Sequence, residues 1–224
     1  SLAAAEEARN ICQVYGYVQN GIHAAVVTIE VHITSGAGIL EIVGLPENMV
    51  KEGSKRIRSA ILTSGFEFPI QRIVVNLAPA TLRKMGTQFV LAIALGFLAA
   101  SGQIDADFVR TRGCFGELGL DGSIRTPRGC LAAVEAADSA NHSALYTGPV
   151  HSELHGSKTP LLRCANLKYL TENLDRGFAA RNSSLHRSLR AAPLDFTNYK
   201  AIVAQAVATR GIVLAAAGFH SLLL

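Results

Sequence analysis

Three basic residues recur at helical spacing in the first third of the sequence. Lys51, Lys55 and Arg58 occupy positions i, i+4 and i+7, and Arg56 lies at the edge of the same stripe. A helix with this spacing presents the three cations on one face, where they can contact phosphate groups of a nucleic acid or a partner subunit. Two glutamates of the same segment lie beside them, so a solvated helix face is the alternative interpretation.

Residues 76–103 form a second stretch with chemical potential. The stretch reads as a strand end, a proline-containing loop with Arg83 and Lys84, and an apolar helix over residues 89–101. A strand-to-helix turn exposes backbone N–H groups near a helix N-terminus, which suits an anion or a nucleophile. Because the helix is apolar on nearly every face, we expect it to be buried and only the loop to act.

The patterns around these two stretches predict alternating strands and helices. Residues 23–33 have strand periodicity, and residues 39–43 are predicted to return beside them as a β-hairpin. Later strands are predicted at 72–77, 144–147 and 161–164, and helices at 46–64, 129–140, 149–155 and 167–174. A hairpin is predicted at 113–125, with Asp121 and Gly122 as its two-residue turn. This order indicates an α/β (α+β) fold in which helices cover a mixed sheet.

The domain organisation follows from changes in composition along the chain. Residues 1–17 read as a helical extension, residues 18–175 as the folded domain, and residues 176–193 as an arginine-containing linker. Residues 194–224 contain one alanine-rich helical pattern and end on an apolar segment that resembles the beginning of a strand. We therefore expect a second domain to begin near residue 194.

Composition limits the classes of partner. A net charge of +4 permits contact with a polyanion without requiring one, and the 6% aromatic content without Trp argues against a ring-built base-stacking surface. The four scattered cysteines predict free thiols in a reducing compartment. The longest apolar run, residues 89–100, is shorter than a bilayer span of about 20 residues. The N-terminal residues lack a signal peptide pattern, so we expect a cytoplasmic protein without membrane contact.

Several sequence blocks in a fixed order point to a known family. They read VTIEVHI, IVGLP at 42–46, KRIRSAILTSGFEFP at 55–69, RIVVNLAPA at 72–80, AIALGFLAASGQI at 92–104 and GELGLDGSIR at 116–125. Over about residues 18–174 the chain closely resembles the amino-terminal domain of the magnesium-chelatase-like AAA+ ATPases, the competence protein ComM family. This resemblance implies the fold of ribosomal protein S5 domain 2, which the Lon protease proteolytic domain shares.

The resemblance also implies a nucleotide partner that this sequence has no evident means of holding. Full-length family members bind ATP and Mg, and residues 204–224 resemble the start of their AAA+ module. The phosphate loop GxxxxGK[ST] occurs nowhere in the sequence, so we assign no cofactor to this chain and do not expect it alone to hydrolyse ATP. Homo-oligomers would form through the AAA+ module.

The Lon-like fold raises the alternative of a serine peptidase, which needs a Ser nucleophile and a Lys base. By resemblance, Gln88 stands at the Ser position and Leu131 near the Lys position, while Ser101 lies at the far end of the predicted helix. The family loop ADLPKEG reads ATLRKMG here, which adds Arg83 and removes two acids. No catalytic residue and no metal ligand is therefore assigned.

Two functions of different classes remain. The first is the non-catalytic amino-terminal domain of a ComM-like ATPase that processes DNA by branch migration during natural transformation, with Lys51, Lys55, Arg58, Arg83 and Lys84 as candidate DNA- or subunit-contacting residues. The second is a structural oligomerisation or substrate-docking module without a ligand of its own.

Overall fold

The computed structural model describes residues 10–82, 84, 87–150, 157–174 and 206–218. The chain divides into two units, residues 1–181 and residues 182–224. Arg83, the predicted helix at 149–155 in its greater part, the predicted linker at 176–193 and the predicted strand start at 222–224 lie outside the described residues. In the second unit the structure describes α7, Ala206–Gly218, which confirms a helix in the alanine-rich tail.

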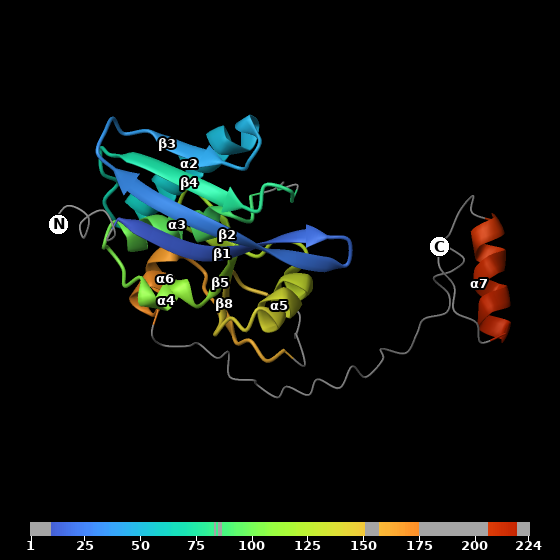
Figure 1. Ribbon diagram of the computed structural model, residues 1–224. Helices are drawn as coiled ribbons and strands as arrows, with labels where there is room; N and C mark the ends of the chain where they lie inside the picture. Colours follow the sequence, from blue (N-terminus) through green and yellow to red (C-terminus); the bar gives the residue numbers. More distant parts are fainter. Residues whose placement is uncertain (1–9, 83, 85–86, 151–156, 175–205, 219–224) are drawn as a thin grey trace. The chain divides into compact units, whose positions relative to one another are not determined.

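A seven-stranded mixed sheet organises the first unit (Figure 1). Its spatial order is β3, β4, β2, β1, β5, β8, β9. The strands are β1 (Ile11–Asn20), β2 (His23–Thr34), β3 (Leu40–Val43), β4 (Arg72–Ala78), β5 (Gly113–Phe115), β8 (Leu145–Thr147) and β9 (Leu161–Arg163). β2 pairs antiparallel with β1 and β4, and the remaining neighbours are parallel. The predicted mixed sheet is therefore confirmed.

Two local predictions at the start of the chain are wrong. Residues 11–17 belong to β1 rather than to a helical extension, because Cys12, Val14 and Val18 alternate into the core. The predicted hairpin between residues 23–33 and 39–43 does not form either, because β4 lies between β2 and β3. The fully apolar inner face of β4 suits an interior position, whereas Val43 of the short β3 is 57% exposed at the sheet edge.

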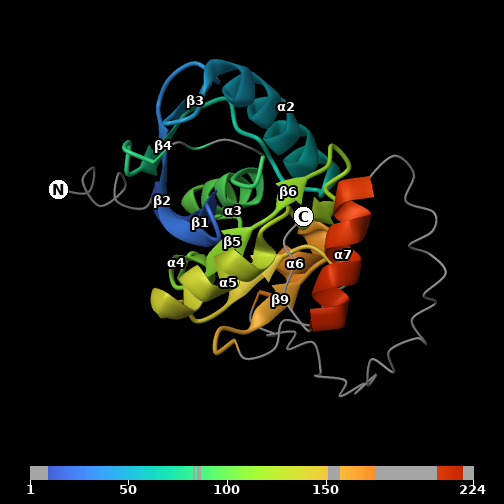
Figure 2. The ribbon, with the colours of Figure 1, turned by 90° about the vertical axis from the view of Figure 1, so that its right-hand side faces the viewer.

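Helices cover both faces of the sheet. α3 (Val90–Ala100) contacts β1, β2 and α2 (Glu47–Thr63), and every one of its residues is buried, as predicted. Figure 2 shows α3 between the β1–β2 part of the sheet and α2. α5 (Cys130–Ser139) packs on the other face, where Tyr17 of β1 and Val26 of β2 point away from the α3 side. Two shorter helices are α4 (Asp107–Arg110) and α6 (Leu167–Glu172).

A small hairpin of β6 (Glu117–Leu118) and β7 (Ile124–Arg125) lies outside the main sheet. Its position confirms a hairpin around Asp121 and Gly122, but the predicted two-residue turn is wrong because residues 119–123 connect the strands. Residues 113–115 belong to β5 of the main sheet rather than to the hairpin. The Asp121 carboxylate accepts a hydrogen bond from the Ser123 backbone N–H at 3.0 Å, and hydrogen bonds from Ser123 lower the pKa of Asp121. Gly122 has φ of 80° and approaches Ser64, which fixes the turn against the end of α2.

The core is aliphatic and the cysteines are part of it. Cys12, Cys114, Cys130 and Cys164 are all buried free thiols, which confirms the predicted absence of disulfides among them. Within the part of the chain that the structure describes, no helix has the length and apolar character needed to cross a membrane.

Candidate functional site

The basic stripe predicted from sequence lies on the surface of α2. Lys51, Lys55 and Arg58 are all exposed. Lys51 pairs with Glu47 one turn earlier at 2.7 Å, in an ion pair whose two side chains are both largely exposed. The Arg58 guanidinium lies over the Phe68 ring, 4.9 Å from its centroid. Lys55 is exposed, and its ammonium makes no hydrogen bond or ion pair with any described residue.

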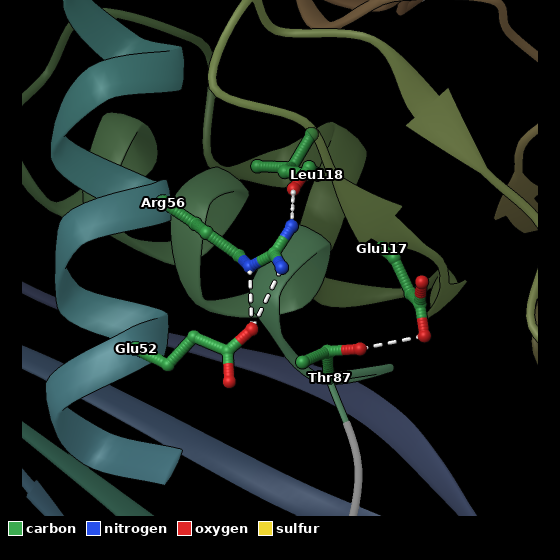
Figure 3. Close-up of polar contacts among 5 residues, drawn as sticks. All are labelled: Glu52, Arg56, Thr87, Glu117 and Leu118. Carbon is green, nitrogen blue, oxygen red and sulfur yellow. Dashed lines mark hydrogen bonds and ion pairs between the residues drawn. The ribbon is translucent and has the colours of Figure 1, made fainter. Parts of the chain in front are cut away.

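Arg56 belongs to the same helix but has a different role. Its guanidinium donates to Glu52 Oε1 at 2.7 Å and 3.0 Å and to the Leu118 carbonyl oxygen at 3.3 Å (Figure 3). The hydrogen bond to Leu118 joins α2 to β6, although Arg56 and Leu118 are 62 positions apart in the sequence. Arg56 therefore joins α2 to the β6–β7 hairpin. The cations of α2 that remain exposed to solvent are Lys51, Lys55 and Arg58.

The loop after β4 holds Lys84 inside rather than outside. Only 3% of Lys84 is exposed, and its ammonium donates to the carbonyl oxygens of Pro79 and Leu82. Burial lowers the pKa of Lys84. An ammonium that is tied to two carbonyl groups of its own loop stabilises the loop, and it is not presented to a nucleic acid in this conformation.

A threonine and a glutamate that sequence reasoning missed fix the other end of this loop. Thr87 Oγ1 donates to Glu117 Oε1 at 2.6 Å, which joins the segment that leads into α3 to β6 (Figure 3). The Leu120 carbonyl of the same hairpin accepts from Ser59 Oγ at 2.9 Å and Thr63 Oγ1 at 2.8 Å on α2. The hairpin is therefore bonded to α2 on one side and to the α3 loop on the other. The GEL motif at residues 116–118 marked the segment but not its partners.

Next to Thr87 and Glu117 the structure has a cavity of about 720 Å³. We call it the β1–β6 cavity. Its lining residues come from the end of β1, the loop between β4 and α3, β5–β6 and the loop before α5. They are Val18, Gln19, Asn20, Thr81, Leu82, Gln88, Phe115, Glu117, Pro127 and Arg128. Gln88, which by resemblance stands at the Ser position of a peptidase, is thus part of its wall. The strand-to-helix turn that the sequence singled out contributes Thr81, Leu82 and Gln88 to the cavity wall, whereas none of the predicted contact residues that the structure describes lines it.

The other residues weighed for peptidase chemistry lie at different helices. Ser101 follows the last residue of α3, and its hydroxyl donates to the Leu98 carbonyl oxygen at 3.1 Å. Leu131 is 53% exposed on α5. No group of three or more His, Cys, Asp or Glu among the described residues is arranged to hold a metal ion. The described geometry offers surfaces and a cavity for binding.

Comparison with known proteins places the chain in a family. The family described as subunit ChlI of Mg-chelatase matches residues 29–148. The chain is 37% identical over 205 residues to a Salmonella typhimurium protein named YifB, a match that covers 91% of this chain and 40% of YifB. It is 34% identical over 219 residues to the competence protein ComM of Haemophilus influenzae, a match that covers 94% of this chain and 42% of ComM.

A more distant relative is a Mycobacterium bovis protein, 31% identical over 208 residues, with 91% of this chain and 41% of that protein covered. The chain spans about two fifths of the length of these relatives. The family match begins within β2 and ends just after β8, so it contains α2, α3, the β6–β7 hairpin and α5 but not β1 or β9. These elements build the basic surface and most of the cavity wall. The chain therefore belongs to the Mg-chelatase subunit ChlI family, as a homologue of ComM and YifB.

Proposed function

We propose that this chain is the non-catalytic amino-terminal domain of a ComM-like, Mg-chelatase-related AAA+ ATPase, and that it contacts DNA through α2. The observation that carries the proposal is the exposed row of Lys51, Lys55 and Arg58, in which Lys55 is not neutralised by any described residue. The name of the ComM relative supports a role in natural transformation, and the family resemblance supports action on branched DNA. ATP and Mg²⁺ belong, in this proposal, to the AAA+ part of the parent protein, which also forms the homo-oligomer in the cytoplasm.

Two features support the non-catalytic part of the proposal. Gln88 occupies the position at which a peptidase of this fold needs a Ser, and Leu131 occupies the position of the Lys base. A carboxamide and an isobutyl group supply neither a nucleophile nor a base. Lys84, the lysine nearest to Gln88 in the sequence, donates its ammonium hydrogen bonds to the carbonyl oxygens of Pro79 and Leu82.

The test is titration of a labelled four-way DNA junction with the chain at several salt concentrations. Phosphate contacts make the logarithm of the binding constant fall with the logarithm of salt, with a slope of about 0.9 per contact on duplex DNA. The triple variant with Gln at Lys51, Lys55 and Arg58 should lose up to about 2.7 from this slope by the same rule.

A matched control removes three exposed cations elsewhere, by the substitutions Lys158→Gln, Lys168→Gln and Arg210→Gln. Because this control changes the net charge equally, it separates a contact surface from a general effect of charge. Equal loss of slope in the two triple variants, or no binding by the native chain at low salt, refutes the role of α2.

A second function, that of an oligomerisation module, has one observation in its favour. β3 is an edge strand of the sheet; Val43, its last residue, is 57% exposed, and Ile39, just before the strand, is 52% exposed. Ile70 is 86% exposed and lies against Gly38. Exposed apolar side chains on an open strand edge suit pairing with another chain. Light scattering tests it: a dimer or larger species that Val43→Lys converts to monomer supports the module, and a monomeric native chain at high concentration contradicts it.

A further inference from the structure

The β1–β6 cavity has a wall with two distinct parts. Val18 and Phe115 are only 5% and 2% exposed and form an apolar floor together with the half-buried Leu82. Glu117 and Arg128 bring opposite charges to the polar part. The volume of about 720 Å³ lies within the range of about 300–1,000 Å³ that is usual for ligand sites.

The two charged residues of the wall do not neutralise each other. Glu117 accepts one hydrogen bond, from Thr87 at its Oε1, and its Oε2 has no partner among the described residues. Arg128 is exposed and forms no ion pair or hydrogen bond within the described part of the chain. A carboxylate oxygen and a guanidinium that face one cavity without pairing leave an acceptor and a set of donors for a ligand.

The side-chain amides of Gln19 and Asn20 add further hydrogen-bond donors and acceptors to the cavity wall. Gln19 donates from Nε2 to the Gly21 carbonyl oxygen at 3.1 Å, and its amide oxygen accepts no hydrogen bond from a described residue. The Asn20 backbone pairs with His23 in the β1–β2 ladder, but its side chain makes no hydrogen bond to a described residue. A wall that alternates donors and acceptors beside an apolar floor matches the N–H and C=O groups of an extended peptide and one apolar side chain. It suits a polynucleotide poorly, because Glu117 would repel phosphate groups.

We propose that the β1–β6 cavity binds a short extended peptide segment of a partner protein. Glu117 accepts a hydrogen bond from a main-chain N–H of the segment, and Arg128 donates to a main-chain carbonyl or a terminal carboxylate. An apolar side chain of the segment packs on Phe115, Val18 and Leu82. This peptide site uses none of the α2 residues, so it stands whether or not α2 contacts DNA.

The experiment uses the full 224-residue chain and two probe peptides, N-acetyl-Ala-Val-Leu with a free carboxylate and the same peptide as its amide. Binding is followed by nuclear magnetic resonance, from shifts of the backbone signals of Gln19, Glu117 and Arg128. We expect saturable shifts of these signals and an affinity at least tenfold lower in Arg128→Gln. If only the acid form loses affinity, Arg128 binds a terminal carboxylate; if both forms do, it binds a main-chain carbonyl.

Two further variants complete the design. Glu117→Gln keeps an oxygen acceptor for Thr87 but removes the charge, and it should weaken both peptides several-fold, while Lys158→Gln serves as a distant control without effect. The proposal is overturned if neither peptide shifts the three signals, if Arg128→Gln binds both peptides as tightly as the native chain, or if hexathymidylate shifts the same signals and competes with the peptides.

Discussion

Adjacent residues on α2 should respond in opposite ways to truncation. Arg56→Ala removes the bond to the Leu118 carbonyl oxygen and the ion pair with Glu52, whereas Lys55→Ala removes an ammonium without a described partner. Both changes replace a long basic residue by Ala in a helix, where the helix propensities of the three residues are similar. The pair therefore isolates the tertiary contacts of Arg56.

The size of the effect follows from the geometry. A hydrogen bond from a charged donor contributes about 1.5–3 kcal/mol, and the 3.3 Å length and 36% exposure of the Arg56 side chain favour the low end. The surface ion pair adds about 0.3–0.5 kcal/mol. We therefore expect Arg56→Ala to lower the free energy of unfolding by about 2 kcal/mol, and Lys55→Ala to change it by less than about 0.5 kcal/mol.

Urea denaturation followed by circular dichroism measures this difference. With a slope of about 2 kcal/mol per molar urea, the midpoint of Arg56→Ala should fall by about 1 M. The salt slope of DNA binding should show the reverse pattern, a decrease of about 0.9 for Lys55→Ala and none for Arg56→Ala. An unchanged midpoint in Arg56→Ala, or equal midpoint losses in the two variants, would refute the assignment of one residue to the fold and the other to the surface.

Three more perturbations test other parts of the structure. Gly113→Ala should destabilise the chain by about 3 kcal/mol in urea denaturation, because its Cβ would lie 1.9 Å from the hydroxyl oxygen of buried Tyr17. Gly53→Ala should stabilise the chain by about 0.5–1 kcal/mol, because its Cβ would have no neighbour nearer than 3.9 Å and Ala favours the helix. Equal effects of the two substitutions contradict this packing. The Tyr17 hydroxyl and His142 Nδ1 form a hydrogen bond, and burial lowers the pKa of His142 below its usual value of 6.5. The unfolded state therefore binds more protons than the folded state, and the free energy of unfolding should fall as the pH drops through 6.5. The urea midpoints of the native chain and His142→Gln should therefore converge from pH 7 to pH 5, and a constant difference argues against this linkage. Lys84→Met should leave the salt slope of DNA binding unchanged, because the ammonium is buried; a loss of about 0.9 would show that Lys84 reaches a phosphate.

The sequence was most informative where the chain has strong periodicity. The apolar helix at residues 89–101 is fully buried as α3, and the strand, hairpin and helix patterns from residue 72 to residue 147 are confirmed almost in place. A helix that is apolar on every face has no stable position except the interior, so composition alone fixes its burial. The ordered motifs also identified the family, because several blocks in sequence specify one fold much more narrowly than a single motif does.

The order of the strands needed the tertiary structure. The hairpin expected between β2 and β3 is absent because β4, which is 29 residues farther along the chain when counted from the end of β3 to its own start, enters between them. Local turn residues predict that a chain reverses, but they do not specify which strand has the more complementary apolar face. That choice depends on non-local packing, here of Ile73, Val75 and Leu77 against the core.

The same distinction applies to the candidate site. Sequence alone determined the residue types: a basic stripe at helical spacing, a loop with Lys84, and Gln88 and Leu131 at the positions that by resemblance correspond to the Ser and Lys of a peptidase. Only the tertiary structure decided that Arg56 turns to Leu118, that Lys84 is buried in its own loop, and that Glu117 and Arg128 share a cavity without pairing. The reason is physical: periodicity reports which face of an element a side chain occupies, whereas its partner is set by elements that are distant in sequence and close only after folding.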